Sequence, residues 1–297
     1  MRIGFLLVLA VPLAGQECAS EIEHARQAYH QKDYTLAARR FERAVVVCPG
    51  RGGLLLDLAK AQFMAQQPQA ADRTLAELLK LEPRNAAALK LKGDAQYLMG
   101  NAVEAERLLL GAIEADPKNP EPRYALGRIY YQQVRLQQSL EQFRKVLELD
   151  PRSYRAYDNM GLAFEGLTDI PRALESYEKA LAIVHKDHPE YDSVYANMAD
   201  LLYRQNDYKR SFQYAAEAAN RNPNSARNFF LTGRALARME RWELAEKWLK
   251  QAVLLDPSLP AARYQLAQVF RSLGKIDEAE RELQAFESVS TGRPARP

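Results

Sequence analysis

The sequence predicts an all-α repeat protein in which about eight antiparallel helix pairs stack into an α-solenoid. Three observations lead to this prediction: a recurring proline and two rows of small residues share one period. The prolines lie 34 residues apart, with one step of 38, at Pro49, Pro83, Pro117, Pro151, Pro189, Pro223 and Pro257. A period of this length is typical of stacked helical hairpins, each of which needs its neighbours to bury its apolar face.

The amino-terminal residues form a separate segment. Met1 and Arg2 precede a mostly apolar run from Ile3 to Ala14, followed by the small Gly15. This pattern is typical of a secretory signal peptide, residues 1–15, cleaved after Ala14 or Gly15. A membrane anchor is the alternative, but crossing the hydrocarbon takes about 20 apolar residues. We therefore expect an exported protein, periplasmic or secreted, with no transmembrane segment in the mature chain. The alternative is a cytoplasmic protein.

The repeat region is expected over residues 18–291, because both rows of small residues span it. The first row is Ala25, Ala59, Gly93, Gly127, Gly161, Ala199, Gly233 and Ala267. The second row follows twelve residues later, at Ala37, Ala71, Ala105, Ser139, Ala173, Ser211, Ala245 and Ala279. Small residues on the apolar stripe of a helix let a second helix come close, so each unit is predicted to be a helix pair.

Turns are expected at positions such as Gly100, Asn206 and Gly274, and each proline is expected to end a second helix. The predicted units are 18–51, 52–85, 86–119, 120–153, 154–191, 192–225, 226–259 and 260–291. Four inserted residues near His185 are expected to lengthen the second helix of the fifth unit or its exit loop.

The last unit is expected to act as a cap with a polar outer face. Ile276, Ala279, Leu283 and Phe286 are predicted to point inward, with the acidic residues between them outward. Beyond this pair, the polar segment 288–297 is expected to form a tail, flexible over residues 292–297.

These residues resemble the tetratricopeptide repeat family, whose units combine small residues, aromatic residues and a terminal proline. The resemblance covers almost the whole chain after the signal segment. It implies a right-handed superhelix of sixteen helices in which the first helix of each pair lines a concave groove. The family's preference for Asp before the proline is met at Asp116, Asp150 and Asp256.

Composition and motifs argue against several functional classes. The chain has 41 Lys and Arg against 38 Asp and Glu, a net charge of +3, which gives no reason to expect nucleic acid. Eight units leave no room for a catalytic fold. His185 and His188 adjoin Pro189 in the insertion, where a solvated loop explains them better than a metal site. We therefore predict no catalytic residue, no cofactor and no metal.

The two cysteines lie at opposite ends of the first unit. Cys18 is expected to open its first helix and Cys48 to close its second, and antiparallel pairing brings those ends together. An even cysteine count in an exported protein favours a disulfide, and the alternative is two unrelated thiols.

Candidate ligand-binding residues lie beside the packing stripe of the first helices, on the surface that the resemblance assigns to the groove. An aromatic row, interrupted by Glu165, consists of Tyr29, Phe63, Tyr97, Tyr131 and Tyr203. Rigid aromatic rings supply large contact area at small entropic cost. The alternative is that these rings pack between units.

Two polar sets accompany the aromatic row. Asn159 and Asn197 take equivalent places in adjacent units, and an amide donates and accepts at once, which suits a peptide backbone. The repeats of O-linked N-acetylglucosamine transferase carry a similar asparagine ladder. An arginine set suits a carboxylate or acidic segment, and consists of Arg204, Arg227, Arg234, Arg238 and Arg271. The alternative is a solvated basic face, with Asp200 near enough to neutralise one arginine.

Together these features predict a non-enzymatic interaction scaffold. Its groove is expected to bind an extended or helical protein segment, one with an acidic part, in an envelope or secreted assembly. One alternative is an accessory subunit of an enzyme or of a polysaccharide- or pilus-secretion complex. The other is a self-associating structural protein.

Overall fold

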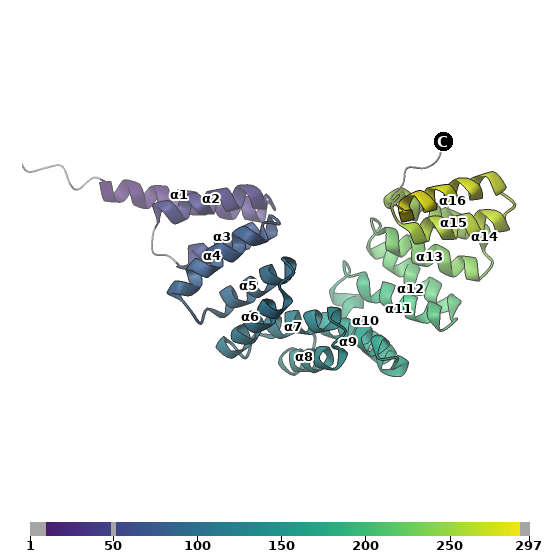
Figure 1. The fold of residues 1–297 in the computed structure, drawn as a ribbon, viewed down its shortest axis with the longest axis horizontal. Coiled ribbons are helices and arrows are strands. Elements are labelled where there is room, and N and C mark those ends of the chain that lie inside the picture. Colours follow the sequence, from purple (N-terminus) through teal and green to yellow (C-terminus); the bar gives the residue numbers. More distant parts are fainter. Residues whose placement is uncertain (1–9, 49–51, 292–297) are drawn as a thin grey trace, which may run out of the picture. The chain divides into compact units, whose positions relative to one another are not determined.

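The structure is a computed structural model that describes residues 10–48 and 52–291, with side chains in the first helix from Glu17 onward. Sixteen α-helices and no strand occur within these ranges, and successive helices form eight antiparallel pairs (Figure 1). The predicted all-α architecture of eight helix pairs is therefore confirmed. The chain divides into two compact units, residues 1–151 and 152–297, which we call the N-terminal and C-terminal units.

Four pairs make up the N-terminal unit. They are α1 (Ala10–His30) with α2 (Tyr34–Val47), α3 (Gly52–Met64) with α4 (Pro68–Leu81), α5 (Ala86–Leu98) with α6 (Ala102–Ala115), and α7 (Pro120–Gln132) with α8 (Leu136–Leu149). Within this unit, the second helix of one pair also packs against the first helix of the next: α2 on α3, α4 on α5 and α6 on α7.

Four further pairs make up the C-terminal unit. They are α9 (Tyr154–Gly166) with α10 (Ile170–Asp187), α11 (Ser193–Arg204) with α12 (Tyr208–Arg221), α13 (Ala226–Arg238) with α14 (Trp242–Leu255), and α15 (Pro260–Ser272) with α16 (Ile276–Thr291). Helix α10 has 18 residues, whereas α8 and α12 have 14 each, so the insertion lengthens the second helix of the fifth pair.

First helices of successive pairs also contact each other. Contacts join α3 to α5 and α5 to α7 in the N-terminal unit, and α9 to α11, α11 to α13 and α13 to α15 in the C-terminal unit. Contacts of similar extent between successive second helices are absent from the described residues. The first helices from α3 to α7 and from α9 to α15 therefore form a closely spaced layer in each unit. We call the outer side of the first helices, α1 included, the first-helix face.

The link within each pair has one repeated backbone conformation. One residue per link has a φ between 58° and 85°, at Lys32, Gln66, Gly100, Val134, Thr168, Asn206, Glu240 and Gly274. The next residue donates its N–H to a carbonyl five residues back, as Asp33 does to Ala28 at 3.0 Å. This arrangement closes the first helix in a Schellman motif and satisfies its free carbonyl groups.

The rows of small residues mark the contact between the two helices of a pair. A Cβ atom added at Gly161 would lie 2.3 Å from Cε1 of Tyr177, and one added at Gly127 would lie 2.7 Å from Cε1 of Phe143. These two glycines therefore admit an aromatic ring of the second helix. At Gly93 and Gly233 an added Cβ would instead meet a leucine side chain and, at 3.3 and 3.2 Å, a backbone atom of the second helix. In the second row, the Ser139 hydroxyl donates to the Gly127 carbonyl oxygen at 2.8 Å, which satisfies a buried polar group.

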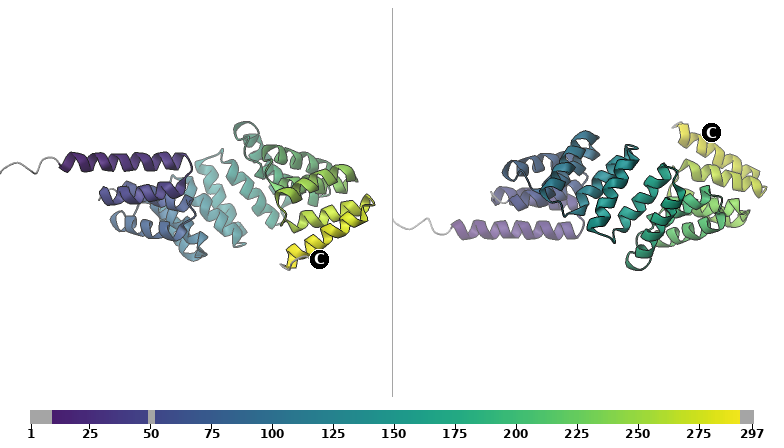
Figure 2. Two further views of the ribbon diagram at one scale, coloured as in Figure 1. Left: turned by 90° about the horizontal axis from the view of Figure 1, so that it is seen from above. Right: turned by 90° about the horizontal axis from the view of Figure 1, so that it is seen from below.

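Three expectations about the chain ends need correction. Helix α1 already begins at Ala10, with Pro12 in its first turn where a missing N–H costs little, so Cys18 lies within the helix rather than opening it. Figure 2 shows α1 extending past α2 at this end. At the other end, α16 continues to Thr291, so residues 288–291 are helical and do not belong to a tail. The expected tail 292–297 and residues 1–9 of the expected signal peptide lie outside the described residues.

The third correction concerns the cap. Ile276 is 53% exposed instead of pointing inward, whereas Ala279 is buried and Leu283 and Phe286 are half-buried. In two other pairs, the residue that starts the second helix packs on a ring five residues earlier: Tyr34 packs on Tyr29, and Tyr208 packs on Tyr203. That earlier residue is Arg271 in the last pair, so Ile276 has no ring to cover.

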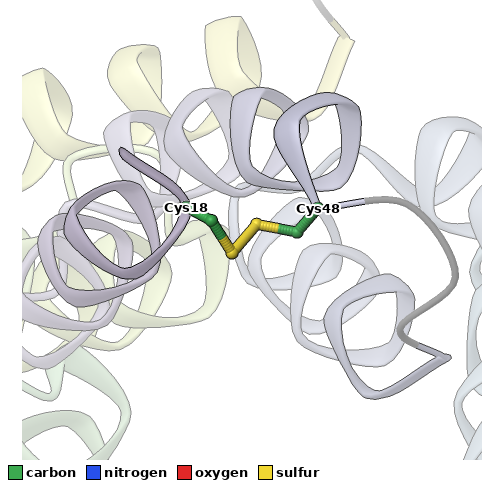
Figure 3. Close-up of a disulfide and its surroundings, with 2 residues drawn as sticks. All are labelled: Cys18 and Cys48. Carbon is green, nitrogen blue, oxygen red and sulfur yellow. A yellow bond between two sulfur atoms is a disulfide. The ribbon is translucent and has the colours of Figure 1, made fainter. Parts of the chain in front are cut away.

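A disulfide joins Cys18 of α1 to Cys48 at the end of α2 (Figure 3). Their Cα atoms are 5.7 Å apart and the sequence separation is 30 residues. Closing a loop of this length stabilises the folded state by roughly 3.5 kcal/mol in the chain-entropy model. The bond therefore ties together the first pair, which has a neighbouring pair on one side only.

The ring contact at Gly161 predicts a specific destabilisation. Replacing Gly161 by Ala should lower the free energy of unfolding by roughly 1–2 kcal/mol, because overpacking against Tyr177 outweighs the gain in helix propensity. Urea denaturation followed by circular dichroism measures this change. The matched control is Gly111→Ala in α6, where the nearest atom, Leu89 Cδ1, is 3.7 Å away and a gain of up to about 1 kcal/mol is expected. Equal stabilisation by both substitutions would contradict the proposed contact.

Candidate functional site

The first-helix face of the C-terminal unit carries a continuous chain of charged side chains. It begins at Glu165 of α9, which accepts hydrogen bonds from the Tyr177 hydroxyl and the Arg204 guanidinium. Arg204 also lies 3.4 Å from an oxygen of Asp200, and the other Asp200 oxygen accepts from Arg234 Nη2 at 2.6 Å. Alternating charges therefore link α9, α11 and α13.

The Arg234 guanidinium is held by rings as well as by charge. It lies 3.9 Å from the centroid of the Tyr203 ring and 5.2 Å from that of Phe230, within the range of cation–π attraction. Its side chain is only 17% exposed. Arg204 and Arg234 are thus engaged by carboxylates of the same face, including the Asp200 that sequence reasoning placed nearby.

The other three predicted arginines have separate environments. Arg227 donates to the Asn197 side-chain oxygen at 3.0 Å, and Arg238 donates to the Tyr208 hydroxyl at 2.9 Å. Arg271 is exposed, and its side chain forms no hydrogen bond or ion pair with the described part of the chain. The structure therefore does not gather the five arginines into one free cationic cluster.

The two predicted asparagines differ in what they bind. Asn197 is buried and donates to Asp158 Oδ1 at 2.9 Å, while Asn159 is half-buried and donates to the Arg155 carbonyl oxygen at 2.8 Å. Asp158 is 2% exposed and also accepts from the Tyr191 hydroxyl at 2.6 Å. Tyr191 belongs to the link between α10 and α11, so the inserted segment supplies a partner for this carboxylate.

Burial controls the ionisation of Asp158. Removal from water raises the pKa of its carboxyl group, and the hydrogen bonds from Tyr191 and Asn197 oppose that rise only in part. Because Asn197 also accepts from Arg227, the amide is already satisfied on both sides and joins α9 to α13.

The five predicted aromatic residues are all half-buried. Two of the rings pack on a ring of their own pair: the Tyr29 and Tyr34 centroids are 5.1 Å apart, and those of Tyr203 and Tyr208 are 5.4 Å apart. Phe63 and Tyr97 border buried apolar clusters that extend into the next pair, over α3–α5 and α5–α7. Packing therefore uses part of each ring, and the remainder stays on the surface. Of the five, Tyr203 alone lies in the C-terminal unit.

A cavity that sequence reasoning missed lies on the first-helix face of the N-terminal unit. Its volume is about 320 Å³, and its lining residues are Arg26, Tyr29, His30, Phe41, Asp57 and Lys60. Only Tyr29 was among the predicted site residues. The available signal was the equivalence of Arg26 and Lys60, which lie 34 residues apart and thus one repeat apart.

The described residues contain neither a metal-binding cluster nor a membrane-spanning helix. Within 10–48 and 52–291, no three His, Cys, Asp or Glu side chains are grouped closely enough to hold a metal ion. In those same ranges, no helix combines the length and the apolar character needed to cross a bilayer.

Comparison with known proteins identifies the family. Three family models described as Tetratricopeptide repeat match the chain, one at residues 152–222, a second at 96–160 and a third at 56–120, 196–262 and 230–289. The chain belongs to the tetratricopeptide repeat family. No curated protein matches its sequence.

Solved structures show the same fold. A tetratricopeptide repeat protein from Parabacteroides merdae is 17% identical with a TM-score of 0.66, over 86% of this chain and 99% of that protein. Pseudomonas aeruginosa pilF is 22% identical with a TM-score of 0.63, over 73% and 97%. YrrB, described as a TPR protein with an unusual peptide-binding site, is 20% identical with a TM-score of 0.50, over 62% and 92%. At these identities the likeness concerns the fold alone.

The raised pKa of Asp158 predicts a pH-dependent stability difference. Its folded-state pKa lies above the unfolded value of about 3.9, so the folded protein binds more protons and loses stability as pH rises through this window. Asp158→Asn cannot ionise and can still hydrogen-bond to Tyr191 and Asn197. As pH rises from the unfolded-state pKa to the folded-state pKa, we expect the variant to become more stable relative to the wild type. Above the folded-state pKa, the difference in free energy of unfolding should stay constant.

Urea denaturation at a series of pH values measures this difference, and a control of opposite sign is available. Hydrogen bonds from Arg210 lower the pKa of Asp207, so Asp207→Asn should lose stability relative to the wild type as pH rises. A pH-independent difference for Asp158→Asn would show that this carboxyl group has the same pKa folded and unfolded.

Proposed function

We propose that the chain is a non-enzymatic adaptor that binds an extended or helical protein segment on its first-helix faces. Tetratricopeptide repeat proteins generally mediate protein–protein interaction. The observation that carries the proposal is the half-buried aromatic row, which leaves ring surface at one-repeat intervals along α1, α3, α5 and α7. A partner segment gains contact area there at little entropic cost, because the rings are already held by their own pair.

The adaptor is further proposed to act outside the cytoplasm, in an envelope or secreted assembly. The apolar amino-terminal segment supports this, and so does the Cys18–Cys48 disulfide, because such bonds persist in oxidising compartments. A cytoplasmic adaptor is the competing proposal. An accessory role within an enzyme or secretion complex is compatible with the same binding face.

Site-specific photocrosslinking in the native cell tests the adaptor. A photoreactive phenylalanine analogue at Tyr97, on the first-helix face, should give a discrete product that contains a second protein. The matched control is the same analogue at Val103 of α6, which is 84% exposed and lies on a second helix of the same pair. We expect at least a tenfold lower yield from Val103, measured by immunoblotting and mass spectrometry.

Two results would contradict the adaptor. Equal yields from both positions would show that the first-helix face has no preference for partners. A product that contains only two copies of this chain would favour the self-associating structural protein instead.

Export is tested on protein purified from its native source. Amino-terminal sequencing should find Gly15 or Gln16 as the first residue, and alkylation without reductant should leave both cysteines unmodified. Native protein that retains Met1 and carries two free thiols would establish the cytoplasmic alternative.

A further inference from the structure

We propose that the cavity between α1 and α3 is a recognition pocket for an acidic side chain that stands beside an apolar side chain in the partner segment. This inference rests on the proposed adaptor function and specifies the chemistry of the partner. It also places recognition of an acidic segment on the N-terminal unit, rather than at the arginine set of the C-terminal unit.

The shape of the cavity suits side chains of a peptide. Its volume of about 320 Å³ is at the lower end of the range for ligand pockets, roughly 300–1,000 Å³. Three elements contribute to it: α1 through Arg26, Tyr29 and His30, α2 through Phe41, and α3 through Asp57 and Lys60. A pocket built across two pairs is present only when the pairs are stacked.

The apolar part of the pocket consists of two rings. Phe41 is 2% exposed and belongs to the buried cluster of the first two pairs, while the half-buried Tyr29 packs against that cluster. Phe41 has almost no accessible surface left, so an apolar side chain gains its contact area on the half-buried Tyr29, a ring that does not have to be ordered on binding.

The charges around these rings favour an anion. Arg26 is exposed and makes no ion pair or hydrogen bond with residues in the described ranges. Lys60 is 3.4 Å from Asp57, but the two side chains are 46% and 31% exposed, so water screens this pair. Two cations and one carboxylate leave a positive balance, and an entering carboxylate meets a guanidinium that is not already neutralised.

At the corresponding repeat position of the C-terminal unit, the arginine is already paired with a carboxylate. Arg26 and Lys60 are one residue after the first small row, and the same place in α11 and α13 holds Asp200 and Arg234. These two neutralise each other at 2.6 Å. An acidic ligand there would have to compete with a carboxylate held by the fold, whereas at Arg26 it has no such competitor.

Selection of peptides on the purified full-length chain tests the pocket. A displayed library of random 12-residue peptides should yield peptides in which Asp or Glu lies next to an aromatic or aliphatic residue. Fluorescence anisotropy then measures the affinity of the best peptide and of its copy with the acidic residue changed to its amide. Arg26→Gln should lower the affinity for the acidic peptide about tenfold and the affinity for the amide peptide less than twofold. The amide peptide has already lost the carboxylate that Arg26 binds, so removing the guanidinium costs it little more.

Arg271→Gln is the matched control, since Arg271 is also an exposed arginine on a first helix without an ion pair in the described chain. It should change either affinity less than twofold. Because the Arg26 side chain makes no ion pair or hydrogen bond within the described residues, its variant should keep the wild-type melting curve by circular dichroism. Lys60→Gln should weaken the acidic peptide as well, by about threefold to tenfold.

The outcomes separate this inference from the proposed function. Selected peptides that bind the wild type and Arg26→Gln equally would overturn the pocket and leave the adaptor standing. An equal loss with Arg271→Gln would also overturn it, because net charge would then explain the effect. If the folded wild-type chain selects no peptide at all, the adaptor proposal and the pocket fail together.

Discussion

The close contact between the two helices of a pair governs the rest of this structure. A small residue on the first helix meets a side chain 16 residues later on the second, as Gly161 meets Tyr177 and Gly233 meets Leu249. This contact places the large apolar groups inside the pair. On the first helices, the side chains that lie beside the contact remain at the surface, and they include the half-buried rings and the charged residues next to them. A partner that binds the first-helix face would therefore contact residues that are not buried in the contact between the two helices.

The fold could be predicted because its determinants are local and periodic. The contact at Gly161 depends on residues of one pair, and the same spacing recurs in each repeat, so periodicity reveals it. The sequence also predicted three of the links between the helices of a pair, because glycine or asparagine takes the left-handed conformation there, at Gly100, Asn206 and Gly274. At Val134 and Thr168 the same conformation is adopted by β-branched residues for which it is unfavourable, and no local signal announces it. There the stacked pairs impose a turn that the residue itself does not favour.

The site was predicted less well, because its state depends on pairings between different repeats. Sequence spacing placed Arg204 and Arg234 on one face, but whether a guanidinium is free depends on side chains such as Glu165, 39 residues away. Rotamers and burial decide such contacts, and neither follows from a period. The same limitation applies to Asp158, a buried carboxyl group whose partner Tyr191, in the inserted segment, lies 33 residues away in the sequence. Sequence spacing therefore predicts that Arg204 and Arg234 lie on the same side of their helices. Whether their charges are paired can be decided only from the structure.

The charged residue that follows the first small row has a different environment in the first pair than in α11 and α13, and this difference has a consequence for binding. In the C-terminal unit, the alternation of Glu165, Arg204, Asp200 and Arg234 ties three first helices together, so the charges stabilise the unit and are poorly available to a ligand. In the N-terminal unit, a disulfide already constrains the first pair, and the Arg26 side chain forms no ion pair or hydrogen bond with the part of the chain that the structure describes. A charged side chain that makes no ion pair within the folded protein can bind a partner without breaking an interaction that stabilises the fold. The covalent bond and the unpaired arginine are thus complementary features of one pair, which can be both firmly held and open to an acidic segment.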